Sequence, residues 1–223
     1  MHDEDRAGRA IKIMAVLQDA TKGMVRPAAD QIVERFGRDP YLVLTSCILS
    51  LRTKDTVSLP ASIRLFERAQ TPRDMLMLAD TDIASVIYPV CFYRRKAATI
   101  RAISEQIIEK YDGLVPCNEK DLLLLPGVGR KTANLVLSQG FGIPAICVDV
   151  HVHRISNRLG LVKTSTPEET ENQLKLILPE KDWSLYNTLV VMWGQNVCVP
   201  QSPFCSRCAL FDLCPRIGVT KSR

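Results

Sequence analysis

Four of the eight cysteines are gathered within a short segment near the C-terminal end of the sequence. They are Cys198, Cys205, Cys208 and Cys214. Thiolates are the usual ligands of zinc and of iron–sulfur clusters, and four of them would satisfy either metal site. A chain without a secretion signal is expected in a reducing compartment, where disulfides are rare. The spacing therefore predicts a metal site whose ligand positions are all filled, so that the metal is not the catalyst.

A second group of residues lies at positions 125–133, which read Leu-Pro-Gly-Val-Gly-Arg-Lys-Thr-Ala. Gly127 and Gly129 tolerate positive φ and lack a Cβ, so another backbone can approach them closely. The N–H groups of such a turn join those at the start of the next helix to form an anion site. We expect Gly127, Val128, Gly129 and Arg130 to hold a DNA phosphate without reading sequence. A turn without a ligand is the simpler alternative.

Lys131 and Asp149 are the candidate catalytic pair. Lys131 lies in the predicted first turn of a helix beside Arg130, where the dipole and the neighbouring cation disfavour an ammonium. A neutral amine can attack an electrophilic carbon. A ten-residue helix is about 15 Å long and nine extended residues reach about 30 Å, so the chain can return and set Asp149 beside Lys131. The alternatives are a solvated lysine and an aspartate that only caps a helix.

Helices are the elements that must position these residues. Asp39, Thr71 and Thr166 each precede a proline, which is typical of a helix start. An early amphipathic helix is indicated by apolar residues at helical spacing. They are Ala10, Ile13, Met14 and Leu17. Further helices are expected over residues 95–110, 118–125, 130–139 and 150–159. The single strand-like run, residues 143–148, has no partner, so the sequence predicts an all-α protein.

Composition excludes several classes of protein. The chain has 223 residues, of which 46% are hydrophobic and 24% charged, so disorder and a fibrous fold are not expected. The apolar segments are too short for a membrane span, and we expect a cytoplasmic protein. A net charge of +5 permits a polyanionic partner. The other four cysteines lie among apolar residues and are expected in the core. They are Cys47, Cys91, Cys117 and Cys147.

Three of these features resemble one known family. Residues 125–133 resemble the helix-hairpin-helix of the endonuclease III family of DNA glycosylases. Residues 148–152, Val-Asp-Val-His-Val, are similar to the loop that ends in the family's catalytic aspartate. The spacing of the four clustered cysteines equals the family pattern, which implies a [4Fe–4S] cluster in the loop 198–214 rather than zinc. The resemblance covers nearly the whole chain.

The resemblance implies base excision repair of duplex DNA that contains damaged bases or abasic sites. Lys131 would attack C1′ of a damaged nucleotide, while Asp149 would help to deprotonate the lysine and stabilise positive charge on the sugar. The implied activity is that of a bifunctional glycosylase and abasic-site lyase for oxidised pyrimidines, acting through a Schiff base and β-elimination. The adenine-removing branch of the family lacks a lysine here, so Lys131 favours the branch that also cleaves the backbone.

Two further segments are similar to those with which the family opens the duplex. Arg52 stands where the family usually has a glutamine that fills the gap left by the flipped base. Phe92 stands where an apolar residue wedges between bases. Arg94, Arg95 and Lys96 follow it and are expected to contact phosphates. The alternative is that Phe92 is a core residue and that the basic run is a solvated helix start.

The family fold implies two lobes. One would be a six-helix domain over residues 33–143 that carries the hairpin. The other would join residues 1–32 to 144–223 and hold the cluster, with the substrate in the groove between the lobes. We expect a monomer. Two alternatives remain, a related glycosylase for mismatched bases and a non-enzymatic DNA-binding module with a structural metal.

Overall fold

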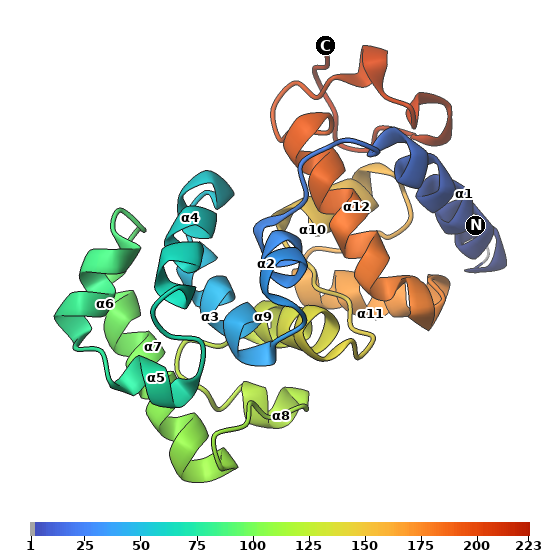
Figure 1. Ribbon diagram of the computed structural model, residues 1–223. Helices are drawn as coiled ribbons and strands as arrows, with labels where there is room; N and C mark the ends of the chain where they lie inside the picture. Colours follow the sequence, from blue (N-terminus) through green and yellow to red (C-terminus); the bar gives the residue numbers. More distant parts are fainter. Residues whose placement is uncertain (1–2) are drawn as a thin grey trace. The chain divides into compact units, whose positions relative to one another are not determined.

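The computed structural model describes residues 3–223, and helices are the regular elements within this range (Figure 1). The predicted strand-like run, residues 143–148, forms no strand. The prediction of an all-α protein is therefore confirmed. The chain divides into two compact units. The hairpin unit is Pro27–Ile143, and the cysteine unit joins the residues up to Arg26 to Pro144–Arg223.

The hairpin unit contains eight α-helices and one π-helical segment, η1. They are α2 (Ala28–Phe36), α3 (Pro40–Ser50), α4 (Asp55–Phe66), α5 (Pro72–Leu76), α6 (Asp80–Ile87), α7 (Tyr93–Tyr111), α8 (Glu119–Leu122), α9 (Arg130–Leu135) and η1 (Val136–Phe141). The expected domain boundary at residue 33 falls inside α2. This helix belongs to the hairpin unit because it packs on α3 and α4.

Helix α3 is the central element of the hairpin unit. It contacts α2, α4, α7, α9 and η1, and every residue from Tyr41 to Leu49 is buried. A helix that is apolar on all sides is suited to such a central position. Asp39 caps its first turn by accepting hydrogen bonds from the backbone N–H groups of Tyr41 and Leu42. The predicted helix start at Asp39-Pro40 is confirmed.

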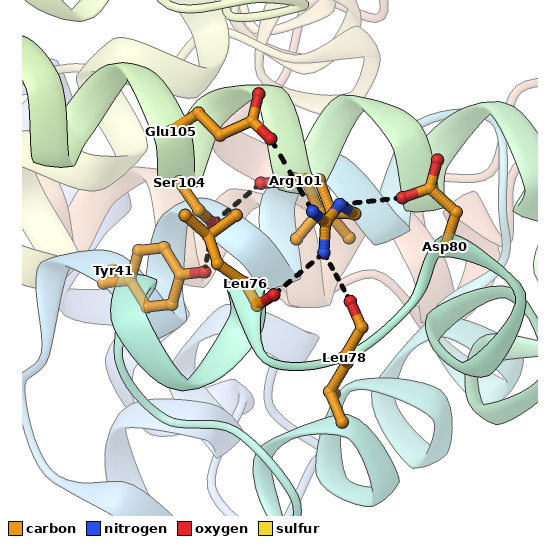
Figure 2. Close-up of polar contacts among 8 residues, drawn as sticks. Tyr41, Leu76, Leu78, Asp80, Arg101, Ser104 and Glu105 are labelled. Atoms are coloured by element: carbon orange, nitrogen blue, oxygen red, sulfur yellow. Dashed lines mark hydrogen bonds and ion pairs between the residues drawn. The ribbon is translucent and has the colours of Figure 1, made fainter.

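Arg101 on α7 fixes the segment between α5 and α6 (Figure 2). Its guanidinium donates to the carbonyl oxygens of Leu76, at 3.1 Å, and of Leu78, and its Nε lies 2.8 Å from Oδ1 of Asp80. Glu105, one turn further along α7, lies 3.7 Å from the same guanidinium. Carbonyl groups at the end of α5 thus gain a partner that the helix itself cannot provide.

The chain after the hairpin changes its helical geometry part-way. The predicted helix over residues 130–139 is α-helical only to Leu135, and continues as the π-helix η1 to Phe141. Gly140 permits this segment to lie against α3, because a Cβ there would come within 2.8 Å of the Pro40 Cα. π-Helical turns are rare and occur often near functional sites.

The cysteine unit has four α-helices and three short 3-10 turns. They are α1 (Asp3–Ala20), α10 (Val150–Arg158), α11 (Pro167–Ile177), η2 (Glu180–Asp182), α12 (Trp183–Asn196), η3 (Cys205–Arg207) and η4 (Phe211–Leu213). Helix α12 packs on α1 and α10 and is mostly buried. The fully buried Tyr186 on α12 has its hydroxyl 2.8 Å from Ser156 Oγ on α10, so this polar group has a partner in the core.

Two more helix starts follow the sequence prediction. Thr71 before α5 and Thr166 before α11 each form a capping box, with Asp74 and Glu169 as the reciprocal partners. The early amphipathic helix is α1, and its predicted apolar positions are buried in the core of the cysteine unit. None of the described helices combines the length and the apolar character that crossing a membrane requires.

Candidate functional site

The turn between α8 and α9 uses its two glycines differently. Gly127 has a φ of +72°, which the turn requires and which other residues rarely adopt. Gly129 has a φ of −105° and is the extended N-cap residue of α9, so it does not use the positive φ that a glycine tolerates. A Cβ at Gly129 would meet no protein atom within 4 Å. Its missing side chain therefore leaves room for a molecule from outside.

Val128 and Arg130, which flank Gly129, both have polar contacts within the hairpin unit. Val128 is buried, and its N–H donates to the carbonyl of Leu125 at 3.1 Å. Arg130 is half-buried, and its Nε lies 3.5 Å from Oε1 of Glu119 on α8. Val128 thus shapes the turn, and a carboxylate that the sequence motif did not reveal stands beside the predicted phosphate site.

Lys131 lies in the first turn of α9, and its side chain is exposed. Helix α9 packs on α3, where burial raises the pKa of the Cys47 thiol to about 12 and the positive charge of Lys131 opposes that rise. The candidate nucleophile therefore lies near a buried, neutral thiol. The hairpin unit by itself leaves the Lys131 side chain exposed.

Asp149 is the N-cap residue of α10 in the cysteine unit. Its Oδ1 accepts hydrogen bonds from the N–H groups of His151, at 2.8 Å, and Val152, at 2.9 Å. The loop before it is held in the core, since Asn187 Nδ2 donates to the carbonyl of Cys147 at 2.5 Å. Because both capping hydrogen bonds end on Oδ1, Oδ2 of the carboxylate is left for a second role. Lys131 and Asp149 belong to different units, so their proximity stays a prediction.

The two histidines after Asp149 have neighbours within the cysteine unit. His153 Nδ1 lies 2.7 Å from the hydroxyl of the buried Thr170 on α11, which gives it a structural role. His151 Nδ1 lies 3.1 Å from the guanidinium of Arg154. Both histidine rings therefore have polar neighbours within the cysteine unit.

The four clustered cysteines line one pocket in the cysteine unit. All four are free thiols of intermediate exposure, and burial raises the pKa of Cys208 and of Cys214. A single zinc ion with Zn–S bonds of about 2.3 Å would require the sulfurs to lie within about 4 Å of one another. Among residues 3–223, no His, Cys, Asp or Glu side chains are grouped to hold one metal ion. The four thiols thus share one pocket, and the metal group that they hold stays a prediction.

The two loops expected to open DNA are exposed in the hairpin unit. Arg52, between α3 and α4, and Phe92, at the start of α7, both have left-handed backbones, with φ of 55° and 57°. Phe92 is 59% exposed, so the alternative that it is a core residue is wrong. Arg94 and Arg95 are also exposed, as a phosphate contact requires. Lys96 is only 6% exposed, and the expectation that it contacts phosphates is wrong.

Comparison with known proteins gives this site a family. Residues 45–180 match the family described as HhH-GPD superfamily base excision DNA repair protein. Endonuclease III of Thermotoga maritima is 48% identical over 196 residues, which span 86% of this chain and 92% of that relative. The chain belongs to the HhH-GPD superfamily of base excision DNA repair proteins.

Solved structures of this superfamily include two that contain DNA. A non-covalent endonuclease III–DNA complex has a TM-score of 0.82 and 33% identity, over 94% of this chain and 95% of that chain. A trapped covalent intermediate of endonuclease III with DNA has a TM-score of 0.75 and 36% identity, over 85% of this chain and 93% of that chain. The chain is thus similar in fold to proteins whose solved structures contain DNA.

Two arginines of α10 were not predicted from the sequence. Arg154 donates to the carbonyl of Cys198 at 2.9 Å, and its burial lowers its pKa. Arg158 donates to the carbonyls of Val199, at 2.8 Å, and Pro200, at 2.7 Å, and approaches Cys198 Sγ at 3.4 Å. Their spacing of one helical turn was the available signal. The helix that Asp149 begins is thus tied to the cysteine loop.

The isolated cysteines divide into two pairs. Cys47 and Cys147 are buried, as predicted. Cys91 and Cys117 are exposed, so their assignment to the core is wrong. Cys91 precedes Phe92 in an exposed loop, and Cys117 precedes the cap of α8, where apolar neighbours in the sequence do not imply burial.

Proposed function

We propose that the protein is a bifunctional DNA glycosylase and abasic-site lyase that removes oxidised pyrimidines from duplex DNA. The observation that carries this proposal is the exposed Lys131 in the first turn of α9, directly after the glycine turn. An exposed lysine can meet a nucleotide that has been flipped out of the helix. Membership of the repair superfamily supports the same reading.

The chemistry begins with the removal of a proton from the Lys131 ammonium, which Asp149 accepts. The amine attacks C1′, the bond from C1′ to the base breaks, and the departing base takes up the proton that Asp149 accepted, which restores the Asp149 carboxylate. The sugar ring opens to form an imine with Lys131. Loss of a proton from C2′ then expels the 3′ phosphate, which is β-elimination. Water finally hydrolyses the imine and frees Lys131.

Asp149 contributes a carboxylate whose direction is fixed. The two hydrogen bonds to Oδ1 hold it at the start of α10 without occupying the other oxygen. A fixed negative charge stabilises positive charge as it develops on the sugar, because no reorganisation is needed at the moment of reaction. Its roles as cap and as catalyst are therefore compatible.

Duplex DNA containing damaged bases or abasic sites is the proposed partner, bound by one copy of the chain in the cytoplasm. Gly129 leaves the turn open to the DNA backbone, Gly127 supplies its positive φ, Val128 shapes it and Arg130 adds charge. Arg94 and Arg95 add exposed positive charge near Phe92. Phosphate contacts of this kind position the enzyme but do not select the lesion.

The clustered cysteines are proposed to hold a [4Fe–4S] cluster. The cluster would join the segments of the loop 198–214 rigidly and supply no step of the reaction. Support comes from the single pocket that all four cysteines line and from the family spacing. The purified protein is expected to absorb near 400 nm, and each of the substitutions Cys205→Ser and Cys208→Ser is expected to remove this absorbance. A colourless protein that contains zinc would contradict the proposal.

The activity is tested with four labelled duplexes that carry a thymine glycol, a G·T mismatch, an abasic site or no lesion. Released base and strand breaks are measured separately. We expect base release and cleavage at thymine glycol, cleavage at the abasic site, and neither on the intact duplex. Activity on the mismatch alone would mean that the enzyme removes mismatched bases and not oxidised pyrimidines. Binding without reaction on all four would indicate a DNA-binding module.

A further inference from the structure

The two exposed loops of the hairpin unit meet at one buried lysine. We call residues 51–54 the plug loop and residues 88–92 the wedge loop, because they carry Arg52 and Phe92. Lys96, in the first turn of α7, sends its ammonium into the plug loop. Its Nζ donates to the carbonyl oxygens of Leu49, at 2.8 Å, and Leu51, at 2.6 Å. The Leu51 carbonyl belongs to the residue directly before Arg52.

A threonine completes the link between the loops. Lys96 Nζ lies 3.1 Å from Thr53 Oγ1, and the same oxygen accepts a hydrogen bond from the N–H of Cys91 at 3.2 Å. Cys91 directly precedes Phe92. The backbone N–H of Lys96 in turn donates to the Phe92 carbonyl at 3.0 Å. Lys96 therefore contacts the backbone directly before Arg52, and through Thr53 it is linked to the backbone directly before Phe92.

The backbone conformation of Arg52 and Phe92 needs stabilising contacts of this kind. Arg52 and Phe92 both have φ in the left-handed region, which residues other than glycine rarely adopt. Strained backbone of this kind persists only where surrounding contacts determine it, and it is concentrated at functional sites. Here the fixed contacts lie directly before Arg52 at Leu51 and on both sides of Phe92.

The choice of a lysine is itself informative. All three acceptors of the ammonium are neutral oxygens, two carbonyls and one hydroxyl. Burying a charge without an opposite charge is unfavourable, and an apolar side chain of similar length would avoid this penalty. A charge kept in such a place is therefore expected to serve the loops that it orders rather than the stability of the fold.

We infer that Lys96 is a positioning residue for duplex opening, which holds Arg52 and Phe92 in the conformation that enters the DNA. This inference rests on the proposed function. Lys96 would act before the chemistry, on the step in which a stacked base is extruded and its gap filled. It would act through the two loops and would not touch the DNA.

The test compares Lys96→Met with the wild-type protein on a duplex that has 2-aminopurine beside a thymine glycol. Fluorescence of 2-aminopurine rises when its neighbours unstack. We expect Lys96→Met to bind the duplex with unchanged affinity, to give little fluorescence rise, and to release base at least about tenfold more slowly, since misplacing a positioned group by about 1 Å can cost about 100-fold in rate. The effect should fall on kcat rather than on KM.

A substrate that needs no opening provides the internal control. On single-stranded DNA with an abasic site, Lys96→Met is expected to cleave as fast as the wild type. Lys110→Met removes the same charge from an exposed position on α7 and should behave as the wild type on both substrates. Equal fluorescence and equal base release by Lys96→Met and the wild type would overturn the inference.

A second variant is available if Lys96→Met does not fold. Thr53→Val keeps the shape of the side chain but removes the hydroxyl that joins Lys96 to the wedge loop. It should lower the fluorescence rise and the rate of base release by about threefold to tenfold, within the usual range for a lost hydrogen bond. Failure of the wild type to release base would refute the proposed function, whereas normal opening by Thr53→Val in an active protein refutes only the role of Lys96.

Discussion

Lys131 and Asp149 both lie at the start of a helix, yet their side chains are held in different ways. The Asp149 carboxylate is fixed by two backbone N–H groups, and the loop before it is anchored in a core. The Lys131 side chain is exposed on a helix of six residues. The carboxylate is thus held in place by its own unit, whereas the amine is exposed in the hairpin unit.

Lys96 extends this comparison to a second lysine. It has the same side chain as Lys131, but it is buried and donates to three oxygens. An exposed lysine suits a nucleophile that must move, and a buried one suits a fixed support. Burial rather than residue type therefore separates the two roles.

The largest effect is expected from Lys131→Ala. Base release and imine formation should fall by at least about a thousandfold, the scale on which loss of a nucleophile acts. Because the side chain is exposed, the free energy of unfolding should change by less than about 0.5 kcal/mol. Single-turnover rates and urea unfolding measure the two quantities, with Lys110→Ala as the control. A stable variant that keeps its rate would refute the assignment.

Two substitutions at Asp149 separate its chemical role from its cap. Asn caps a helix as well as Asp does, so Asp149→Asn should keep stability but slow base release by about 10²–10⁴-fold. Asp149→Ala should slow the reaction as much and also lower the free energy of unfolding by about 1 kcal/mol. If Asp149→Asn reacts at the wild-type rate, the residue is only a cap.

The buried lysine predicts a dependence on pH. Burial lowers the pKa of Lys96 to about 8, so its ammonium loses a proton and one donor as the pH rises through that value. Duplex opening, followed by 2-aminopurine fluorescence, should then decrease. In the unfolded chain a lysine stays protonated to about pH 10.4, so the unfolded state binds more protons between these values. Stability relative to Lys96→Met should therefore increase with pH across the same window.

The nearby Cys91 thiol must be separated from this effect, because its charge acts on Lys96. The experiment is therefore repeated with Cys91→Ser in both the wild-type and the Lys96→Met background. A decline in opening that persists in Lys96→Met would show that another group is responsible.

The smallest effect is expected at the glycine turn. Glu119 lies beside Arg130, and an exposed ion pair of this kind contributes about 0.2–1 kcal/mol. Glu119→Gln removes one ion-pair partner of the guanidinium together with a negative charge, so DNA binding should tighten by at most about fivefold. Fluorescence anisotropy at low and high salt measures the change, with Glu109→Gln on α7 as the control. Weaker binding by Glu119→Gln would mean that the carboxylate supports the turn instead.

Local features were predictable from the sequence, and long-range ones were not. The caps at Asp39, Thr71 and Thr166 depend on a few adjacent residues, and the structure has all three. The burial of Lys96 depends on a loop more than forty residues away, and its basic neighbours suggested an exposed side chain. Pro40 closely approaches Gly140 in the π-helical segment, and helical periodicity cannot reveal this contact.

The candidate site shows the same division. Residue types and spacing identified Lys131, Asp149 and the clustered cysteines, because each lies in a short motif. Glu119 beside Arg130 and the two arginines of α10 that hold the cysteine loop depend on side chains brought together by the fold. No local pattern marks the Glu119 contact. The one-turn spacing of Arg154 and Arg158 is visible in the sequence, but solvated helix faces commonly carry the same spacing.

The central claim is that an exposed lysine after the glycine turn bonds to the DNA sugar. Borohydride is added while the wild-type protein acts on a duplex with one thymine glycol, and the trapped complex is digested and mapped by mass spectrometry. The account predicts a nucleotide adduct on the peptide that contains Lys131, with no adduct in Lys131→Ala. An adduct on another lysine, or base release with no adduct, would contradict it.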